Sequence, residues 1–242
     1  MSSSYEVVFS QDGFFVTATH ENRMRKYAEG QTHCAVWLKS MTWEVWTAAD
    51  SAIGRRVDEF AAKQYPFRTL EGLDFCKINA LDEKHVRQAV ESFFSWSALA
   101  LHMTFRYFPQ HAYCMADPRE PKLQVIVVQL LGTGSKITLY KRSHHTPLKP
   151  KAASNGLLEV QRELLKTPDI EEIQKDMKDG GLVVLDARLS FNIQGRAITL
   201  AFANKEELAR WGRIKLPNNA YLRQKVKAME TEKIGMNYEF ED

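Results

Sequence analysis

The sequence predicts a mainly β protein with flanking helices, in which two sheets pack as a sandwich beside an N-terminal helical layer. Two observations support this fold class: apolar residues recur at helical spacing before residue 98, and short β-branched and aromatic runs dominate from 99 to 203. With 242 residues, 44% hydrophobic and 26% charged, the chain can bury one sizeable core. We expect a single domain over 1–242, with a helical buttress and short strands in 1–98, the sheet core in 99–203 and a C-terminal helix and tail in 204–242.

The N-terminal region is predicted to contain a hairpin and two helices. The hairpin joins 6–9 to 14–19 through Asp12-Gly13, a common turn dipeptide. The first helix covers 42–64 and begins with Trp43 and Trp46 in an apolar series at three- and four-residue steps. The second helix covers 82–96, and Asp82 is placed to cap its amino end.

The sheet core is predicted from five runs of β-branched and aromatic residues. They cover 99–108, 123–131, 136–140, 182–185 and 197–202. Residues 157–177 are polar with apolar residues at helical spacing, and Thr167-Pro168 is expected to divide them into two helices. Residues 220–242 are typical of a short charged helix followed by a tail.

Charge and composition argue against several functional classes. The net charge is +3, from 33 basic and 30 acidic residues spread along the chain, so nucleic-acid binding is not expected. The N-terminus lacks a secretory pattern, and no apolar run approaches the roughly 20 residues of a membrane helix, which predicts a cytoplasmic protein without membrane contact. Cys34, Cys76 and Cys114 are odd in number and far apart, as expected for reduced thiols.

Two segments carry a resemblance to a known family. Residues 124–145 contain a strand, a glycine-containing turn, a second strand and then Ser143-His144, and residues 180–203 contain a Gly-led strand followed by another strand. Over 99–203 this order resembles the phytanoyl-CoA-hydroxylase-like members of the non-haem iron, 2-oxoglutarate dioxygenase superfamily. The family's Pro-Gly-Ser-His segment is Lys141-Arg142-Ser143-His144 here. The resemblance implies a double-stranded β-helix, also called a cupin-like jelly roll.

The resemblance also implies where an iron centre would lie, and the residues there differ from the family pattern. The family binds iron through His-x-Asp and a distal histidine. At the typical separation before Ser143-His144 stands His111, but Tyr113 replaces the carboxylate and Ser190 stands near the distal position. A phenol and a serine hydroxyl do not replace a carboxylate and an imidazole around Fe(II). We therefore expect no metal and no cofactor in this chain, and no iron catalysis.

Other polar residues were weighed for the same site. Asp117 is too far along the chain from His111 for strand alternation to direct both side chains to one point. His144 and His145 are adjacent, so on a strand at most one could face a given site. Arg196 matches the family's co-substrate arginine, as a relic that could still bind a carboxylate, but an ion pair with an acid such as Asp186 is an equal alternative.

Two functions remain, and a plain ligand-binding jelly roll is a third. The first is a catalytically inactive accessory subunit, resembling the metal-triad-deficient subunit of fungal heterodimeric dioxygenases of natural-product biosynthesis, whose partner would supply Fe(II) and 2-oxoglutarate. Aromatic residues concentrate at stable interfaces, so Trp43 and Trp46 of the helical layer are the candidate anchors. The alternative is a metal-independent isomerase or cyclase acting on a small natural product, with His111, Tyr113 and Arg196 as acid, base or anion binder.

Overall fold

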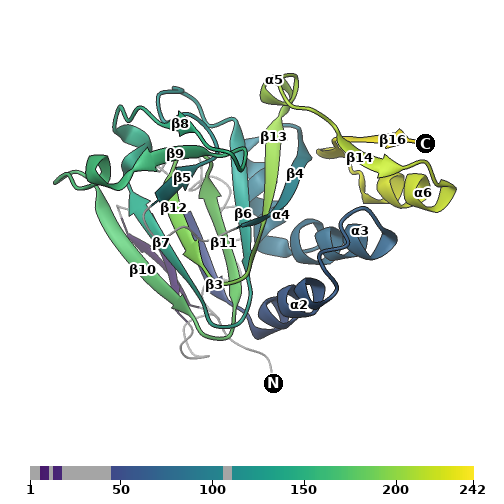
Figure 1. Ribbon diagram of the computed structural model, residues 1–242, viewed down its shortest axis with the longest axis horizontal. Coiled ribbons are helices and arrows are strands. Elements are labelled where there is room, and N and C mark those ends of the chain that lie inside the picture. The colour runs from purple at the N-terminus through teal and green to yellow at the C-terminus, as the bar shows by residue number, and fades with distance from the viewer. Residues whose placement is uncertain (1–5, 11–12, 18–44, 106–110) are drawn as a thin grey trace, which may run out of the picture.

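The computed structural model describes residues 6–10, 13–17, 45–105 and 111–242, with side chains described from Thr47 onward. Two six-stranded sheets pack face to face (Figure 1). The helix-covered sheet has the strand order β15 (Ile234–Met236), β4 (Ser97–Phe105), β13 (Ala197–Asn204), β6 (Val125–Leu131), β11 (Gly181–Asp186) and β3 (Val45–Ala49). The second sheet has the order β10 (Glu171–Met177), β7 (Ser135–Lys141), β12 (Ser190–Gln194), β5 (His111–Cys114), β9 (Leu158–Gln161) and β8 (Lys151–Ala152).

The chain crosses repeatedly from one sheet to the other. Strands β4, β6, β11 and β13 lie in the helix-covered sheet, and β5, β7, β10 and β12 lie in the second sheet. Neighbours among these strands are antiparallel. This path is a double-stranded β-helix, so the predicted fold class is confirmed.

The central strand β6 shows why the strand runs were recognisable. Val125, Val127 and Leu131 face the interior between the sheets, whereas Ile126 and Val128 face the helices. All seven residues of β6 are buried, because both faces of the helix-covered sheet are covered. A strand buried on both faces reads as a continuous apolar run, which is the pattern found in the sequence.

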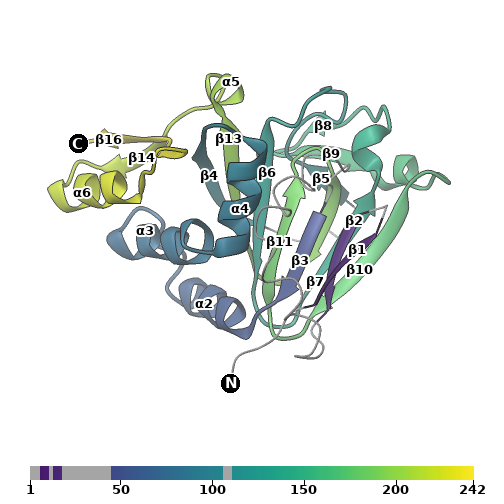
Figure 2. The ribbon, with the colours of Figure 1, turned by 180° about the vertical axis from the view of Figure 1, so that it is seen from behind.

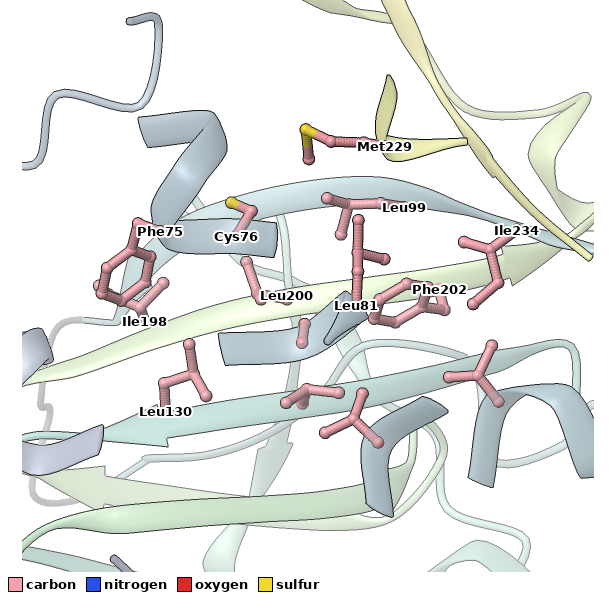
Figure 3. Close-up of a cluster of buried hydrophobic side chains, with 14 of the residues drawn as sticks. Phe75, Cys76, Leu81, Leu99, Leu130, Ile198, Leu200, Phe202, Met229 and Ile234 are labelled. Carbon is pink, nitrogen blue, oxygen red and sulfur yellow. The ribbon is translucent and has the colours of Figure 1, made fainter. Parts of the chain in front are cut away.

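Helices α2 (Ser51–Ala62), α3 (Leu70–Cys76) and α4 (Lys84–Phe93), with the π-helical turn η2 (Lys77–Leu81), cover one face of the helix-covered sheet (Figures 1 and 2). Their apolar faces and the outward side chains of the sheet form one buried cluster, part of which is drawn in Figure 3. Asp50 caps α2 by accepting hydrogen bonds from the backbone of Ala52 and Ile53. The helical layer therefore buries its own apolar stripe within the chain.

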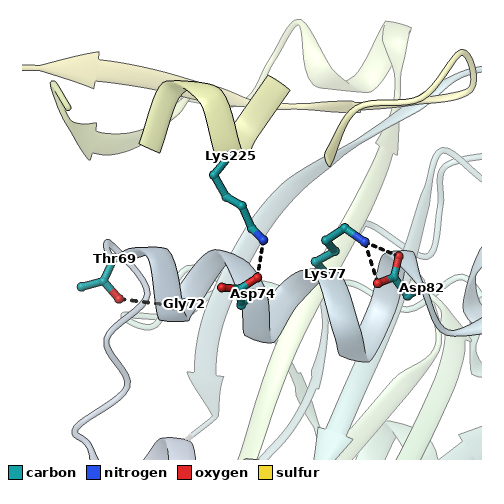
Figure 4. Close-up of polar contacts among 6 residues, drawn as sticks. All are labelled: Thr69, Gly72, Asp74, Lys77, Asp82 and Lys225. Atoms are coloured by element: carbon teal, nitrogen blue, oxygen red, sulfur yellow. Dashed lines mark hydrogen bonds and ion pairs between the residues drawn. The ribbon is translucent and has the colours of Figure 1, made fainter. Parts of the chain in front are cut away.

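The C-terminal region extends the same layer. Helix α6 (Ala220–Met229) lies beside α3, where Lys225 forms an ion pair with Asp74 (Figure 4). After α6 the chain forms β15, which joins the helix-covered sheet, and then β16 (Tyr238–Glu241), which pairs in parallel with β14 (Ile214–Pro217). The predicted helix is present, but the predicted tail contains strands. Within the described residues, no helix has the length and apolar character needed to cross a membrane.

The N-terminal predictions were partly right. Strands β1 (Glu6–Ser10) and β2 (Gly13–Thr17) form the expected antiparallel hairpin. The helix predicted over 42–64 begins only at Ser51, because Val45–Ala49 forms β3 and pairs with β11, with Trp46 opposite Val184. Trp46 is therefore on a strand, and Trp43 lies outside the described residues.

The cap predicted for α4 was assigned one residue too early. The side chain of Glu83 accepts a hydrogen bond from the backbone N–H of Val86, so Glu83 is the N-cap. Asp82 instead accepts hydrogen bonds from Lys77 at 2.6 Å (Figure 4). Asp82 therefore links the two ends of the η2 turn, and the capping of α4 is left to Glu83.

The two helices predicted over 157–177 are absent. The segment forms β9, a short 3₁₀ turn η4 (Arg162–Leu165) and β10. β10 is an edge strand whose outward side is polar and exposed, and it pairs with β7 along its whole length. Its charged sequence matches a solvated helix as well as a solvated edge strand, and pairing with β7 decides between them.

Candidate functional site

The candidate site begins with β5, which lies in the second sheet between β12 and β9. Side chains alternate along a strand, so His111 and Tyr113 face the interior while Ala112 and Cys114 face the opposite side. Tyr113 accordingly belongs to the interior apolar cluster, and Ala112 and Cys114 belong to a separate outer cluster. The two residues that the sequence singled out are thus brought to one face.

Tyr113 lies among aromatic side chains that fill the space between the sheets. It pairs in register with Phe191 of β12, and its ring makes an edge-on contact with Phe105 of β4 at a centroid distance of 5.7 Å. Phe105 and Phe191 are also 5.7 Å apart. Tyr113 is only 2% exposed. Three aromatic rings therefore occupy the interior beside β5.

His111 lies at the edge of this aromatic group and is half-exposed. Its Nδ1 atom is 3.0 Å from Oε2 of Glu159 on β9. Its backbone carbonyl accepts a hydrogen bond of 2.7 Å from the side chain of Asn192. Glu159 is in register with Tyr113, and the rings of His111 and Tyr113 are 6.0 Å apart. His111, Tyr113 and Glu159 therefore share one face of β5 and β9.

Burial controls the protonation of the phenol at this site. The loss of solvent raises the pKa of Tyr113, and the nearby carboxylate of Glu159 raises it further. Tyr113 therefore stays neutral at physiological pH. A neutral phenol keeps its proton and can donate a hydrogen bond to a ligand oxygen.

Glu159 is the site residue that the sequence reasoning missed. The segment that contains it was predicted to be helical. In a helix, the side chain of Glu159 would lie on a different face from the one that strand alternation gives it. The alternation in Leu158-Glu159-Val160-Gln161 was the available signal, because β-strands alternate apolar and polar residues. The pairing of β9 with β5 then brings the carboxylate to His111.

Ser190 does not face the site. It pairs with Tyr140 of β7, and its backbone N–H donates a hydrogen bond of 2.8 Å to the side-chain oxygen of Ser143. Tyr140 belongs to the outer cluster, whereas Phe191, the next residue along β12, belongs to the interior cluster. The interior position of this strand is therefore occupied by Phe191.

Arg196 also lies away from His111 and Tyr113. Its Nε atom donates a hydrogen bond of 2.8 Å to Asp58 of α2, and 57% of its side chain is exposed. The acid is therefore Asp58 and not Asp186, which binds Arg188 at 2.6 Å. An Arg196 guanidinium held by the helical layer does not join the face of β5.

Asp117 and the two adjacent histidines are engaged elsewhere. Asp117 binds Arg119 at 2.6 Å. His144 and His145 lie in the 3₁₀ turn η3 (Ser143–His145) and not on a strand, and their ring centroids are 3.8 Å apart. Burial lowers the pKa of His144 to about 4, so its imidazole is neutral at physiological pH.

The residues at this face do not fit the iron centre that the resemblance implies. An Fe(II) site of that kind needs two histidines and a carboxylate directed at one point. In the part of the chain that the structure describes, no three side chains of His, Cys, Asp or Glu gather in this way. The interior positions next to His111 carry the aromatic rings of Tyr113 and Phe191.

Comparisons with known proteins give structural similarity only. No protein-family model matches the chain, and no curated protein matches it in sequence. HygX from Streptomyces hygroscopicus with iron bound is similar at a TM-score of 0.47 and 9% identity, over 93% of this chain and 98% of that chain. EctD from S. alaskensis with 2-oxoglutarate and 5-hydroxyectoine is similar at a TM-score of 0.42 and 9% identity, over 66% of this chain and 70% of that chain. The function of this chain rests on its own residues.

Proposed function

We propose that this chain is a catalytically inactive, dioxygenase-like accessory subunit that pairs in the cytoplasm with a homologous catalytic oxygenase of natural-product biosynthesis. The partner would hold Fe(II) and 2-oxoglutarate, and this chain would hold neither. The supporting observation is the aromatic filling of the interior by Phe105, Tyr113 and Phe191. A catalytic member needs that space for a metal and its co-substrate.

The last strand of the double-stranded β-helix agrees with this proposal. The inward positions of β13 carry small side chains, Ala197, Thr199 and Ala201. Thr199 donates a hydrogen bond of 2.7 Å to the side-chain oxygen of the buried Gln129 on β6. Arg196, the residue that resembles the co-substrate arginine, is held outside by Asp58. The guanidinium of Arg196 is therefore not directed at the inward residues of β13, where a 2-oxo acid would lie.

The partner interface needs a surface that the fold does not use for itself. The apolar faces of α2 and α4 are buried against the helix-covered sheet, so they are not available to a partner. Leu70 and Ile78 on α3 and η2 are exposed. Trp46 on β3, with Trp43 just before it, remains the proposed anchor, and Leu70 and Ile78 are added to it.

Co-expression with a ligand-complete homologous oxygenase tests the proposal. We expect a stable pair whose oxygenase activity requires this chain. Glutamate substitutions at Trp43 or Trp46 are expected to dissociate the pair while this chain stays folded, whereas Tyr221→Glu on the exposed face of α6 is the matched control. The isolated chain, reconstituted anaerobically with Fe(II), should hold no stoichiometric iron and should not decarboxylate 2-oxoglutarate. One tightly held iron per chain, or a monomer that ignores every homologous oxygenase, contradicts the proposal.

A second candidate function is a metal-independent isomerase or cyclase, and the contact between His111 and Glu159 favours it. A general base needs a group near it that can orient it, and Oε2 of Glu159 lies 3.0 Å from Nδ1 of His111. Tyr113 shares the same face, while Arg196 does not. Substrate turnover by the isolated, chelator-treated chain would support this function.

A further inference from the structure

The outer face of the second sheet, which points away from the helix-covered sheet, carries a polar pocket that neither proposed function uses. Its volume is about 140 Å³, and it lies over β10, β7 and β12, which are neighbours in that sheet (Figure 1). Every described residue that lines it is polar. We infer that this pocket binds one neutral sugar ring, either a free monosaccharide or the end of a glycoside. The inference depends on neither a partner subunit nor a metal.

Strand pairing arranges the side chains of the pocket as a grid. Gln174 of β10 is in register with Thr138 of β7, and Thr138 is in register with Asn192 of β12. Gln194 lies on the same face, two residues further along β12. Neighbouring side chains are therefore about 5 Å apart across the strands and about 7 Å apart along them. The apolar residues between them point into the interior between the sheets.

The grid offers hydrogen-bonding groups to a ligand. In the part of the chain that the structure describes, the side chains of Thr138, Gln174 and Gln194 make no hydrogen bond to another protein group. Asn192 is 6% exposed, and its Nδ2 atom donates a hydrogen bond of 2.7 Å to the carbonyl of His111, which fixes the side chain in the floor. Amides and hydroxyls both donate and accept hydrogen bonds, as the hydroxyls of a sugar do. The walls are therefore complementary to a ring that carries several hydroxyls.

The charges at the rim of the pocket are balanced. Arg162 begins the turn η4, and Leu165 of the same turn is buried in the outer apolar cluster, which holds the turn against the sheet. Nη2 of Arg162 is 3.4 Å from Oε1 of Glu172. Nζ of Lys136 is 3.3 Å from Oδ1 of Asp176. Because each cation has a carboxylate beside it, the pocket favours a neutral ligand over an anion or a cation.

The size of the pocket fits one ring. A cavity of about 150 Å³ is large enough for benzene, so the pocket accommodates a six-membered ring, whereas drug-sized ligands need roughly 300 Å³ or more. An apolar ring would gain little here, because its burial needs apolar surroundings. A hydroxylated ring can instead bond to the floor and both walls. Since no described aromatic ring lines the pocket to stack on the sugar, we expect a Kd on the order of 1 mM.

Ligand-observed NMR tests the pocket with defined probes. The full chain is titrated with D-glucose, D-galactose and D-mannose and with the methyl α- and β-glycosides of each, and the saturation-transfer signals are followed. We expect saturable binding of at least one of these sugars. A methyl glycoside that binds as strongly as its free sugar identifies the end of a glycoside as the ligand. Binding of the free sugar alone identifies a monosaccharide.

Single substitutions locate the binding. Thr138→Val, Gln174→Ala and Gln194→Ala should each weaken it about two- to tenfold, as expected for the loss of one hydrogen bond. Gln161→Ala is the matched control, because it removes an exposed amide from β9, outside the pocket, and it should bind as the wild type does. Urea unfolding checks that all four variants are folded. Binding that the three pocket variants leave unchanged, or no saturable binding of any of the sugars, overturns the inference.

Inorganic phosphate tests the preference for a neutral ligand. Phosphate should not displace the sugar from the wild type, because the cations at the rim are paired. Glu172→Gln leaves the charge of Arg162 without its carboxylate, so phosphate should compete with the sugar in this variant. Displacement of the sugar from the wild type by phosphate would overturn the assignment of a neutral ligand.

Discussion

Two Asp-x-Arg segments of this chain make the same local contacts in different surroundings. In Asp117–Arg119 and in Asp186–Arg188, the arginine backbone N–H lies 2.9 Å from Oδ1, Nε lies 3.0 Å from Oδ1 and Nη2 lies 2.6 Å from Oδ2. The side chains of Asp117 and Arg119 are 28% and 56% exposed, whereas those of Asp186 and Arg188 are 2% and 13% exposed. Identical geometry is thus combined with opposite burial.

The buried pair also joins two connections of the fold. Nη1 of Arg188 donates a hydrogen bond of 2.9 Å to the carbonyl of Glu120 in the β5–β6 connection. The carbonyl of Ala187 accepts hydrogen bonds from Met115 and Ala116 of the same connection. The comparison teaches that a short sequence motif fixes the contact, while the surroundings fix its energetic importance.

The largest expected effect comes from removing the buried carboxylate. Asp186→Ala should lower the free energy of unfolding by about 3–5 kcal/mol, because Arg188 would remain as a buried charge without its counter-ion. Asp117→Ala is the matched control and should change it by about 0–1 kcal/mol, as for exposed pairs. Urea unfolding of both variants measures the difference. Equal losses would show that burial does not distinguish the two segments.

The next effect is a pH dependence at His144, which lies near Asp186. Burial lowers the pKa of His144 from 6.5 to about 4, and the charge of Asp186 opposes this shift. The unfolded chain therefore binds a proton at a higher pH than the folded chain, so stability should fall as the pH falls from about 6.5 to about 4. His102, whose pKa burial also lowers to about 4, adds to the same trend.

Urea unfolding at pH 7 and pH 4.5 measures this dependence. His144→Gln should lose less stability between the two pH values than the wild type does, because one group that binds protons differently in the two states is gone. His85→Gln on α4 serves as the control, since His85 is exposed. A variant that loses as much stability as the wild type would rule out His144 as a source of the pH dependence.

The smallest expected effect concerns a third Asp–Arg contact, between Asp58 and Arg196. This pair is largely exposed, so Arg196→Ala should lower the free energy of unfolding by about 1 kcal/mol or less. If Arg196 is a relic, the activity of a complex with a catalytic partner should stay within a few-fold of the wild type. A large loss of activity in a well-folded complex would instead show that Arg196 binds a ligand and is more than the partner of Asp58 in an exposed ion pair.

The parts of the fold that were predictable are those that are buried on both faces. β6, β11 and β13 were found because their side chains are apolar toward the helices and toward the interior alike. β10 was not found, because its composition reflects solvent and its partner β7 lies elsewhere in the sequence. The strand at Val45–Ala49 was merged with α2, since the aromatic spacing across the two elements imitates one helix.

Only those residues of the candidate site that lie on a single strand were predictable from the sequence. His111 and Tyr113 were identified, and alternation along β5 places both on the inner face. Glu159 reaches His111 through strand pairing that the local sequence does not encode. Near the distal position, the sequence indicated Ser190, but the interior residue is Phe191, because a shift of one residue along a strand reverses the face.

The alternation of strands between the two sheets has a consequence for how the chain is made. β4 pairs with β13, and the edge strand β15 pairs with β4, so partners that adjoin in the sheet are synthesised far apart in time. Until residue 204 has left the ribosome, the largely apolar strand β6 lacks its neighbour β13. Folds dominated by such distant pairings fold slowly and expose aggregation-prone strands meanwhile. Recombinant yield should therefore respond to slower translation and to chaperones more than to surface substitutions.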